Sequence, residues 1–205
     1  MQGYILHTQR VRDEDLIVYI LSKNKLLKAY RFYGLRHSSI LSGYKIDFAL
    51  EEHMSFLPRL KDTMHLGFEW ILNREKMLIW QEFIRLFYRH LKDIEECDSF
   101  YFELLNESAK RFARQNSKRV ILDAYLELLS FEGRLHTKFR CFVCDELIDN
   151  ENIGLVRAFL PAHKDCAFVY EVAQDKLKHF YQNKNSSIFD DNEVSDMYKI
   201  IKEGF

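Results

Sequence analysis

The chain has 205 residues, of which 47% are hydrophobic and 30% charged, the composition of an ordinary globular protein large enough to bury a core. No run of about eighteen apolar residues occurs, and the first residues lack the charged-then-apolar pattern of a signal segment. Only four cysteines are present, and three of them fall in one cluster, so we do not expect a secreted disulfide framework. We therefore expect a protein of the reducing cytoplasm with no membrane partner.

The net charge of −1 is unevenly distributed along the chain. Residues 1–67 contain ten Lys and Arg against seven Asp and Glu, whereas residues 68–205 contain 20 against 24. Within residues 1–42 the excess is larger, at seven basic residues against three acidic ones. This asymmetry places a candidate polyanion site near the N-terminus, although ordinary surface charge would give a similar count.

The first part of the chain has the pattern of short β-strands. The expected strands cover residues 3–9, 16–21, 25–34, 44–52 and 54–60, with a charged loop at 10–15 and Pro58 favouring an edge position for the fifth strand. Residues 44–51 alternate clearly, with Tyr44, Ile46, Phe48 and Leu50 on one face. Five short strands in so few residues favour a small closed barrel, for which the oligonucleotide-binding (OB) fold is the commonest architecture.

The apolar period changes to 3.6 near residue 67, and helices are predicted from there on. We expect helices over residues 68–92, after a cap at Asp98, from a cap at Ser117 to a stop at Gly133, over 166–181 and over 193–203. The predicted fold is α+β, with a five-stranded OB barrel at 1–67 and an all-helical domain at 68–205. A zinc-finger-like insertion at 141–166 interrupts the helical domain.

A metal site is the clearest chemical motif. Cys141 and Cys144 form a CxxC pair, and after eighteen intervening residues His163 and Cys166 form a second pair with the same spacing. Three thiolates and one imidazole can surround one tetrahedral Zn²⁺. A redox dithiol or a chance arrangement is the alternative, but a redox pair has no use for a second pair of ligands. We predict structural zinc, because four protein ligands leave no open position for catalysis.

A mixture of cations and aromatic rings near the N-terminus favours single-stranded nucleic acid, because cations bind phosphates while rings stack on bases. The candidate binding residues are Arg10, Arg12, Lys28, Tyr30, Arg31, Tyr33, Arg36 and His37. The alternative is that Phe32 and one tyrosine fill the barrel while the cations form a solvated face. The sequence contains no nucleotide-triphosphate loop, no GxSxG elbow and no dinucleotide fingerprint, so no catalytic residues are predicted.

Taken in order, these features resemble the bacterial RecO family of recombination mediators. The resemblance is carried by residues 4–9 with 13–16, by residues 33–39, which are similar to the family's KGAR-x-x-S turn, by residues 44–50, and by the Cys141, Cys144, His163, Cys166 ligand set. Two departures are that His163 replaces the usual third cysteine and Tyr33 replaces the lysine of the turn. The resemblance covers nearly the whole chain.

The resemblance implies a non-enzymatic role in the RecF pathway of DNA repair, in the cytoplasm at the nucleoid. Such a protein anneals complementary strands and helps to load recombinase onto DNA coated by single-strand-binding protein. Its implied partners are single-stranded DNA, double-stranded DNA as a further ligand, RecR and the single-strand-binding protein. The alternatives from other classes are a zinc-dependent nucleic-acid hydrolase and a protein–protein adaptor that does not bind DNA.

Overall fold

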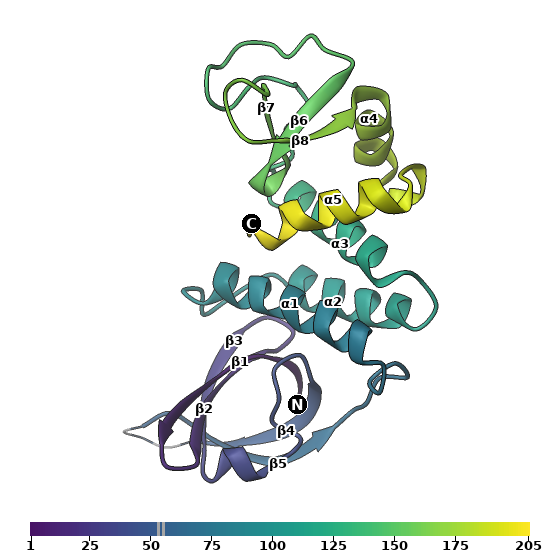
Figure 1. Cartoon of the computed structure of the whole chain (residues 1–205). Helices are drawn as coiled ribbons and strands as arrows, with labels where there is room; N and C mark the ends of the chain where they lie inside the picture. The colour runs from purple at the N-terminus through teal and green to yellow at the C-terminus, as the bar shows by residue number, and fades with distance from the viewer. Residues whose placement is uncertain (53, 55) are drawn as a thin grey trace. The chain divides into compact units, whose positions relative to one another are not determined.

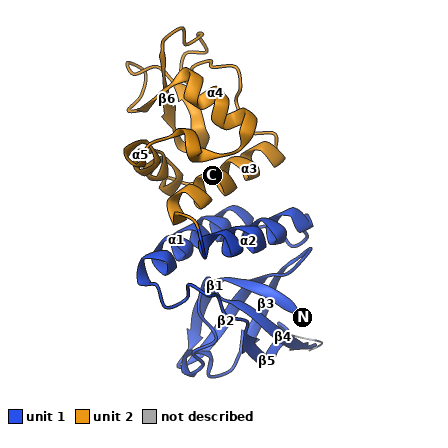
Figure 2. Ribbon diagram, turned by 90° about the vertical axis from the view of Figure 1, so that its right-hand side faces the viewer, with its two compact units in different colours: residues 1–114 blue, residues 115–205 orange. Residues whose placement is uncertain are grey.

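The computed structural model describes residues 1–52, 54 and 56–205, and the chain divides into two compact units, Met1–Arg114 and Gln115–Phe205 (Figure 2). The first unit contains a five-stranded barrel with two helices, and the second contains helices, a small sheet and the predicted metal cluster. The α+β fold class is therefore confirmed. Within the described ranges, no helix is both long enough and apolar enough to span a bilayer.

The barrel closes in the order β1-β2-β3-β5-β4, which leaves no open edge. Its strands are β1 (Gln2–Arg12), β2 (Asp15–Leu21), β3 (Leu26–Arg31), β4 (Lys45–Glu51) and β5 (Arg59–His65). All neighbouring pairs are antiparallel except β3 and β5, which meet in parallel where Tyr30 lies beside Arg59. This five-stranded arrangement is the one predicted from the alternating apolar pattern.

The barrel core is filled by the apolar residues that point inward from all five strands, together with Ile40: Ile5, Leu16, Val18, Ile20, Ala29, Ile46, Phe48 and Leu60. Ile46 and Phe48 are buried, and Tyr44 and Leu50 pack against the same core, so the predicted inward face of residues 44–50 is confirmed.

Two details of the predicted barrel are wrong. The charged loop expected at 10–15 is only the turn at Asp13 and Glu14, since β1 extends to Arg12 and β2 begins at Asp15. The fifth strand, expected at 54–60, begins at Arg59 because Pro58 cannot donate a ladder hydrogen bond, although its carbonyl accepts one from the Tyr30 N–H at 2.8 Å. Residue 55 of that predicted range lies outside the described residues.

Two helices, α1 (Arg74–Leu91) and α2 (Ser99–Phe112), cover one end of the barrel within the first unit (Figure 1). Trp80 of α1 is fully buried and donates its indole N–H to the Gly43 carbonyl at 2.8 Å. Tyr4 of β1 packs against Trp80 and donates its hydroxyl to Asn106 of α2 at 2.9 Å. The predicted domain limit at residue 67 stays a prediction, and the compact unit extends through both helices.

The first helix begins later than the apolar stripe predicts. Asn73 caps it by accepting the Lys76 N–H at 3.0 Å, so the predicted start at residue 68 is wrong. Leu72, just before the helix, and Leu78 within it are exposed although both are apolar. The second helix begins after Asp98 as predicted, with the Asp98 carboxylate accepting the Phe100 N–H at 2.7 Å.

The second unit is built from α3 (Ser117–Phe131), α4 (Gln174–Asn183), α5 (Asp191–Lys202) and a three-stranded antiparallel sheet in the order β7-β6-β8. The strands are β6 (Asn152–Val156), β7 (Leu160–Ala162) and β8 (Tyr170–Ala173). Buried residues of α3, α5 and the sheet form its core. The unit therefore holds a small sheet beside its helices, which an all-helical domain would not contain.

Three element limits in this unit differ from the predictions. Asn116 caps α3 in place of Ser117, by accepting the Lys118 N–H at 3.0 Å. The single helix expected at 166–181 is instead strand β8 followed by α4, because residues 170–173 pair with β6. The last helix begins at Asp191 rather than at residue 193, since Asp190 and Glu193 form a capping box. Gly133, at φ 68°, lies just beyond α3 as predicted.

Candidate nucleic-acid interface and metal cluster

The turn between β1 and β2 organises the predicted interface. Arg10 donates its Nε–H to the Asp13 carbonyl at 2.6 Å, and Arg12 pairs in register with Asp15 across the hairpin. Both arginines are exposed. The short turn therefore presents two guanidinium groups to solvent, at the end of the barrel where the β1–β2 connection of OB folds binds oligonucleotides.

Asp15 connects this hairpin to the end of β3. Its carboxylate accepts the Tyr30 hydroxyl at 2.6 Å and the Tyr33 N–H at 2.8 Å. These hydrogen bonds hold the pKa of Asp15 below its usual value, because they favour the charged carboxylate. Tyr33 adopts a left-handed φ of 50°, and Gly34 after it leaves no room for a Cβ, which would lie 2.8 Å from the Leu16 side chain. The turn at residues 33–34 is thus fixed in place.

Tyr33 and Arg36 form one exposed pair on this surface. The Arg36 guanidinium lies 5.1 Å from the centre of the Tyr33 ring, a cation–π distance, and Arg36 also forms an ion pair with Glu14. Both side chains are more than half exposed. The structure therefore brings a ring and a cation of the predicted set together beside the hairpin.

Three predicted residues are placed differently. Arg31 donates to the Leu60 carbonyl at 2.7 Å and contacts the His37 Nε2 at 3.2 Å, so its guanidinium is used within the barrel. Lys28 lies over the ring of Tyr19 at 5.5 Å and lines a different groove, with Lys25 and Lys92. Lys28 is therefore separate from the Arg12 and Tyr30 surface.

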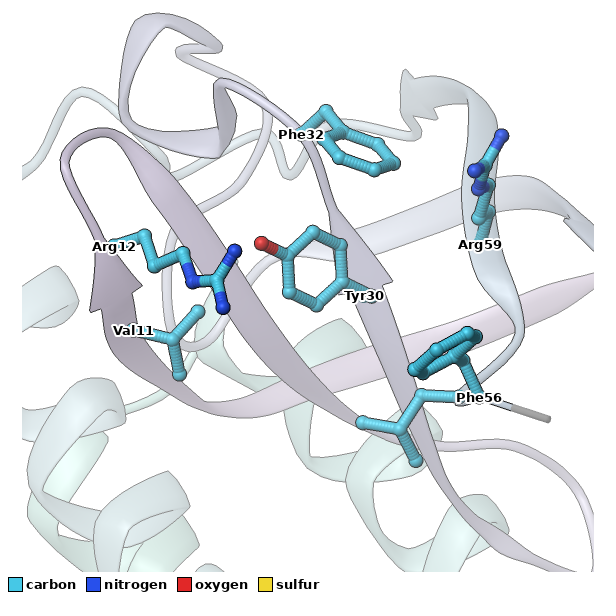
Figure 3. Close-up of a pocket in the computed structure, with 7 residues that line it drawn as sticks. Val11, Arg12, Tyr30, Phe32, Phe56 and Arg59 are labelled. Carbon is cyan, nitrogen blue, oxygen red and sulfur yellow. The ribbon is translucent and has the colours of Figure 1, made fainter.

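A pocket of about 430 Å³ lies between the end of the hairpin, the end of β3 and the β4–β5 connection (Figure 3). It is lined by Val11, Arg12, Tyr30, Phe32, Phe56, Leu57 and Arg59. Only Arg12 and Tyr30 were in the predicted set. Phe32 is 45% exposed, so the alternative in which it fills the barrel is wrong. The predicted set did not include Phe56 and Arg59. An aromatic residue and a cation close together after the fourth strand were a usable signal for them.

The four predicted metal ligands meet in the second unit. The Sγ atoms of Cys141, Cys144 and Cys166 and a ring nitrogen of His163 all lie within 4.8 Å of one another. The Nδ1 atom of His163 is 3.4 Å from the Cys144 sulfur and 3.9 Å from the Cys166 sulfur. Ligands of tetrahedral zinc, with bonds of about 2.0–2.3 Å, are separated by similar distances. The cluster could therefore hold a metal ion.

The surroundings of His163 fit a metal ligand. Its Nδ1 faces the thiols, while its Nε2 lies 3.3 Å from the Leu147 carbonyl, as expected for a ligating imidazole whose second nitrogen is held by a backbone acceptor. The His163 backbone N–H also donates to the Cys141 sulfur at 3.4 Å. Donor chemistry and orientation therefore agree with a bound divalent ion.

The thiols differ in their readiness to ionise. Burial raises the pKa of Cys141, but the backbone N–H groups of Cys144, His163 and Val143 outweigh burial and lower it to about 6. Burial and the neighbouring sulfur atoms raise the pKa of Cys166 to about 11. A divalent cation would relieve this crowding of thiolates. The site thus holds one readily formed thiolate, Cys141, and one thiol of raised pKa, Cys166, that a bound metal would deprotonate.

The fold is that of a protein with a closed OB-type barrel and a separate unit that carries a Cys₃His cluster. Exposed rings and cations lie near the β1–β2 and β4–β5 connections of the barrel. Residues 1–71 match the family model described as RecO N terminal. This match covers the barrel and agrees with the RecO resemblance found in the sequence. No curated protein matches the chain significantly.

Proposed function

We propose that this protein is a recombination mediator of DNA repair that binds single-stranded DNA through its barrel. The observation that carries the proposal is the RecO-type barrel with Arg12, Tyr33 and Arg36 exposed around one fixed turn. In this role it anneals complementary strands and helps recombinase onto DNA coated by single-strand-binding protein. RecR is its proposed partner, and double-stranded DNA and the single-strand-binding protein are further proposed ligands.

The mechanism is electrostatic and steric rather than chemical. Arg10, Arg12 and Arg36 attract the sugar–phosphate backbone, and Tyr33 offers a ring to a base. The barrel is closed and the turn at residues 33–34 is fixed by Asp15, so little ordering is needed when a strand binds. Arg31, His37 and Lys28 stay in the proposed set, with Arg31 and His37 supporting the turn between them.

The proposed metal is zinc in a structural role. Cys141, Cys144, His163 and Cys166 would hold it, and four protein ligands leave no position for a reacting water. When bound, the ion would cross-link two chain segments that are far apart in sequence. These segments are the turn after Arg140, where a bridge pairs Arg140 with Leu147, and the turn at 163–166 that follows β7.

A salt titration tests the interface. In the Arg12→Ala, Arg36→Ala double variant, affinity for a single-stranded oligonucleotide should fall. The magnitude of the slope of log K against log salt should decrease by about 1.4, because each lost phosphate contact on a single strand removes about 0.7. The matched control is Lys138→Ala with Lys178→Ala, two exposed lysines of the second unit. Fluorescence anisotropy at several salt concentrations gives both quantities.

An unchanged slope in the arginine variant, or an equal loss in the lysine control, would contradict this placement of the interface. Strand annealing measured with and without RecR on coated DNA tests the mediator role itself. Cleavage of labelled strands in the presence of Zn²⁺ or Mg²⁺ would instead support the hydrolase, and retention of a protein partner without DNA would support the adaptor.

A further inference from the structure

The pocket beside the hairpin has three aromatic walls. Tyr30 and Phe32 are set edge to face, with ring centres 4.9 Å apart, and Phe56 lines the same space from the β4–β5 connection. Phe32 is 45% exposed and Phe56 is 76% exposed, so both rings offer surface to a ligand. Figure 3 shows Tyr30 between the other two rings. Large exposed rings grouped around one hollow are unusual on a surface that binds nothing.

Two guanidinium groups border this aromatic pocket. Arg12 comes from the end of β1, and Arg59 comes from the start of β5, where it pairs in register with Tyr30. Arg59 lies 5.0 Å from the centre of the Phe32 ring. The two cations lie on opposite sides of Tyr30 in Figure 3. A ligand that fills the pocket therefore meets aromatic rings set at an angle to one another, with a guanidinium group on either side of Tyr30.

We propose that this pocket takes one unpaired base of a single strand, stacked on Phe32 and Phe56, while Arg12 and Arg59 hold the phosphates on either side of it. The inference rests on the proposed function and specifies the ligand of this site, which is a single strand with one base turned out of its stack. A pocket of about 430 Å³ is within the size range of pockets for small ligands. In a duplex the bases are paired and stacked, so the pocket favours single strands over double strands.

The arrangement favours a base over an aromatic side chain of a protein partner. A nucleotide carries a phosphate on each side of its base, which matches one cation on each side of the rings. The pocket also lies between the β1–β2 and β4–β5 connections, the part of an OB barrel that binds oligonucleotides. Tyr30 cannot be displaced easily, because its hydroxyl is held by Asp15 at 2.6 Å. The floor of the pocket is therefore preformed.

The test compares two DNA ligands on variants of the whole protein. One is a single-stranded oligonucleotide, and the other, called the abasic chain, is the same oligonucleotide with abasic positions. The intact strand should bind the native protein more tightly than the abasic chain. In Phe32→Ala affinity for the intact strand should fall, and it should fall further in Phe32→Ala with Phe56→Ala. The total loss should be roughly 5- to 150-fold, the range for loss of one stacked base. Affinity for the abasic chain should not change.

Phe32→Tyr should restore binding of the intact strand, because it restores the ring, and Phe168→Ala, at an 86% exposed ring of the second unit, is the matched control. Thermal unfolding checks that each variant is folded. If the native protein binds neither chain, the proposed function itself fails. If it binds DNA and Phe32→Ala loses nothing, only the pocket inference fails. Binding of an acidic aromatic peptide that depends on Phe32, with unchanged DNA binding, would assign the pocket to a protein partner and overturn the inference.

Discussion

His65 is a side chain that makes the stability of the barrel depend on pH. Its ring lies 4.2 Å from the Tyr44 ring, and its Nε2 is buried with no hydrogen-bond partner among the described residues. Burial lowers the pKa of His65, and it does the same for His7. Both imidazoles are therefore kept neutral in the folded barrel more readily than in the unfolded chain, where the pKa is about 6.5.

The sign of the pH dependence follows from this lowering. A depressed histidine pKa contributes stability that is fully present above about pH 6.5 and is lost as the pH falls through the folded-state pKa. We expect the urea midpoint of the first unit to fall between about pH 8 and about pH 5, and His65→Phe, which keeps a ring against Tyr44, should flatten that fall. An unchanged pH dependence in His65→Phe would exclude a contribution from His65.

Residue-scale prediction succeeded where neighbours in sequence stay neighbours in space. Arg36 and Tyr33 are three residues apart and form one exposed pair, and the four metal ligands come from two short motifs. Phe56 and Arg59 could not be placed in the same way, because they reach Tyr30 only when β3 and β5 pair across the barrel. Their proximity to each other could be read from the sequence, but the strand pairing that brings them to Tyr30 could not. The pocket is thus a product of barrel closure.

At the scale of elements, α1 is the main support of the barrel. Trp80 is fully buried, donates to the Gly43 carbonyl and contacts the ring of Tyr4. We expect Trp80→Ala to destabilise the first unit by about 3–5 kcal/mol, because it leaves a cavity and an unsatisfied carbonyl. Denaturant unfolding measures this loss.

Leu72→Ala, at a 95% exposed position, is the control, and its free energy of unfolding should change by no more than about 0.5 kcal/mol. Similar losses in both variants would refute the role of Trp80.

Long helices and strands were predicted more accurately than short ones, because their apolar patterns contain more repeats. The first four strands and the helices of residues 74–131 are long enough for a period to be counted, and they were predicted with errors mainly at their ends. Strands β6, β7 and β8 have five, three and four residues, too few to show alternation. Strands β6 and β7 lie between the two ligand motifs, and β8 follows the second motif. The small sheet was therefore missed, and β8 was taken for the start of a helix.

At the scale of the whole molecule, the proposed DNA site and the metal cluster belong to different compact units. We expect native protein to contain about one zinc ion per chain, and Cys144→Ser to lose the ion and lower the unfolding temperature of the second unit. Affinity for single-stranded DNA should be unchanged. Elemental analysis, thermal unfolding and anisotropy give the three values.

Cys97→Ser is the matched control for this variant, since Cys97 is the one cysteine outside the cluster and lies in the first unit. If elemental analysis finds no metal in the native protein, the assignment of the four ligands is contradicted. A fall in DNA affinity that accompanies metal loss would show that the second unit takes part in binding, and would contradict the separation proposed between the two sites.

The carboxylates of the β1–β2 turn have a kinetic consequence. Glu14 already pairs with Arg36, so a phosphate that reaches Arg36 must exchange with an internal anion. While a strand is bound, Glu14 competes with the phosphate for the guanidinium, which weakens this contact and shortens the residence time of the strand. Under the proposed function, such a built-in competitor suits a protein that has to hand its strand to another molecule: it favours rapid turnover over tight retention.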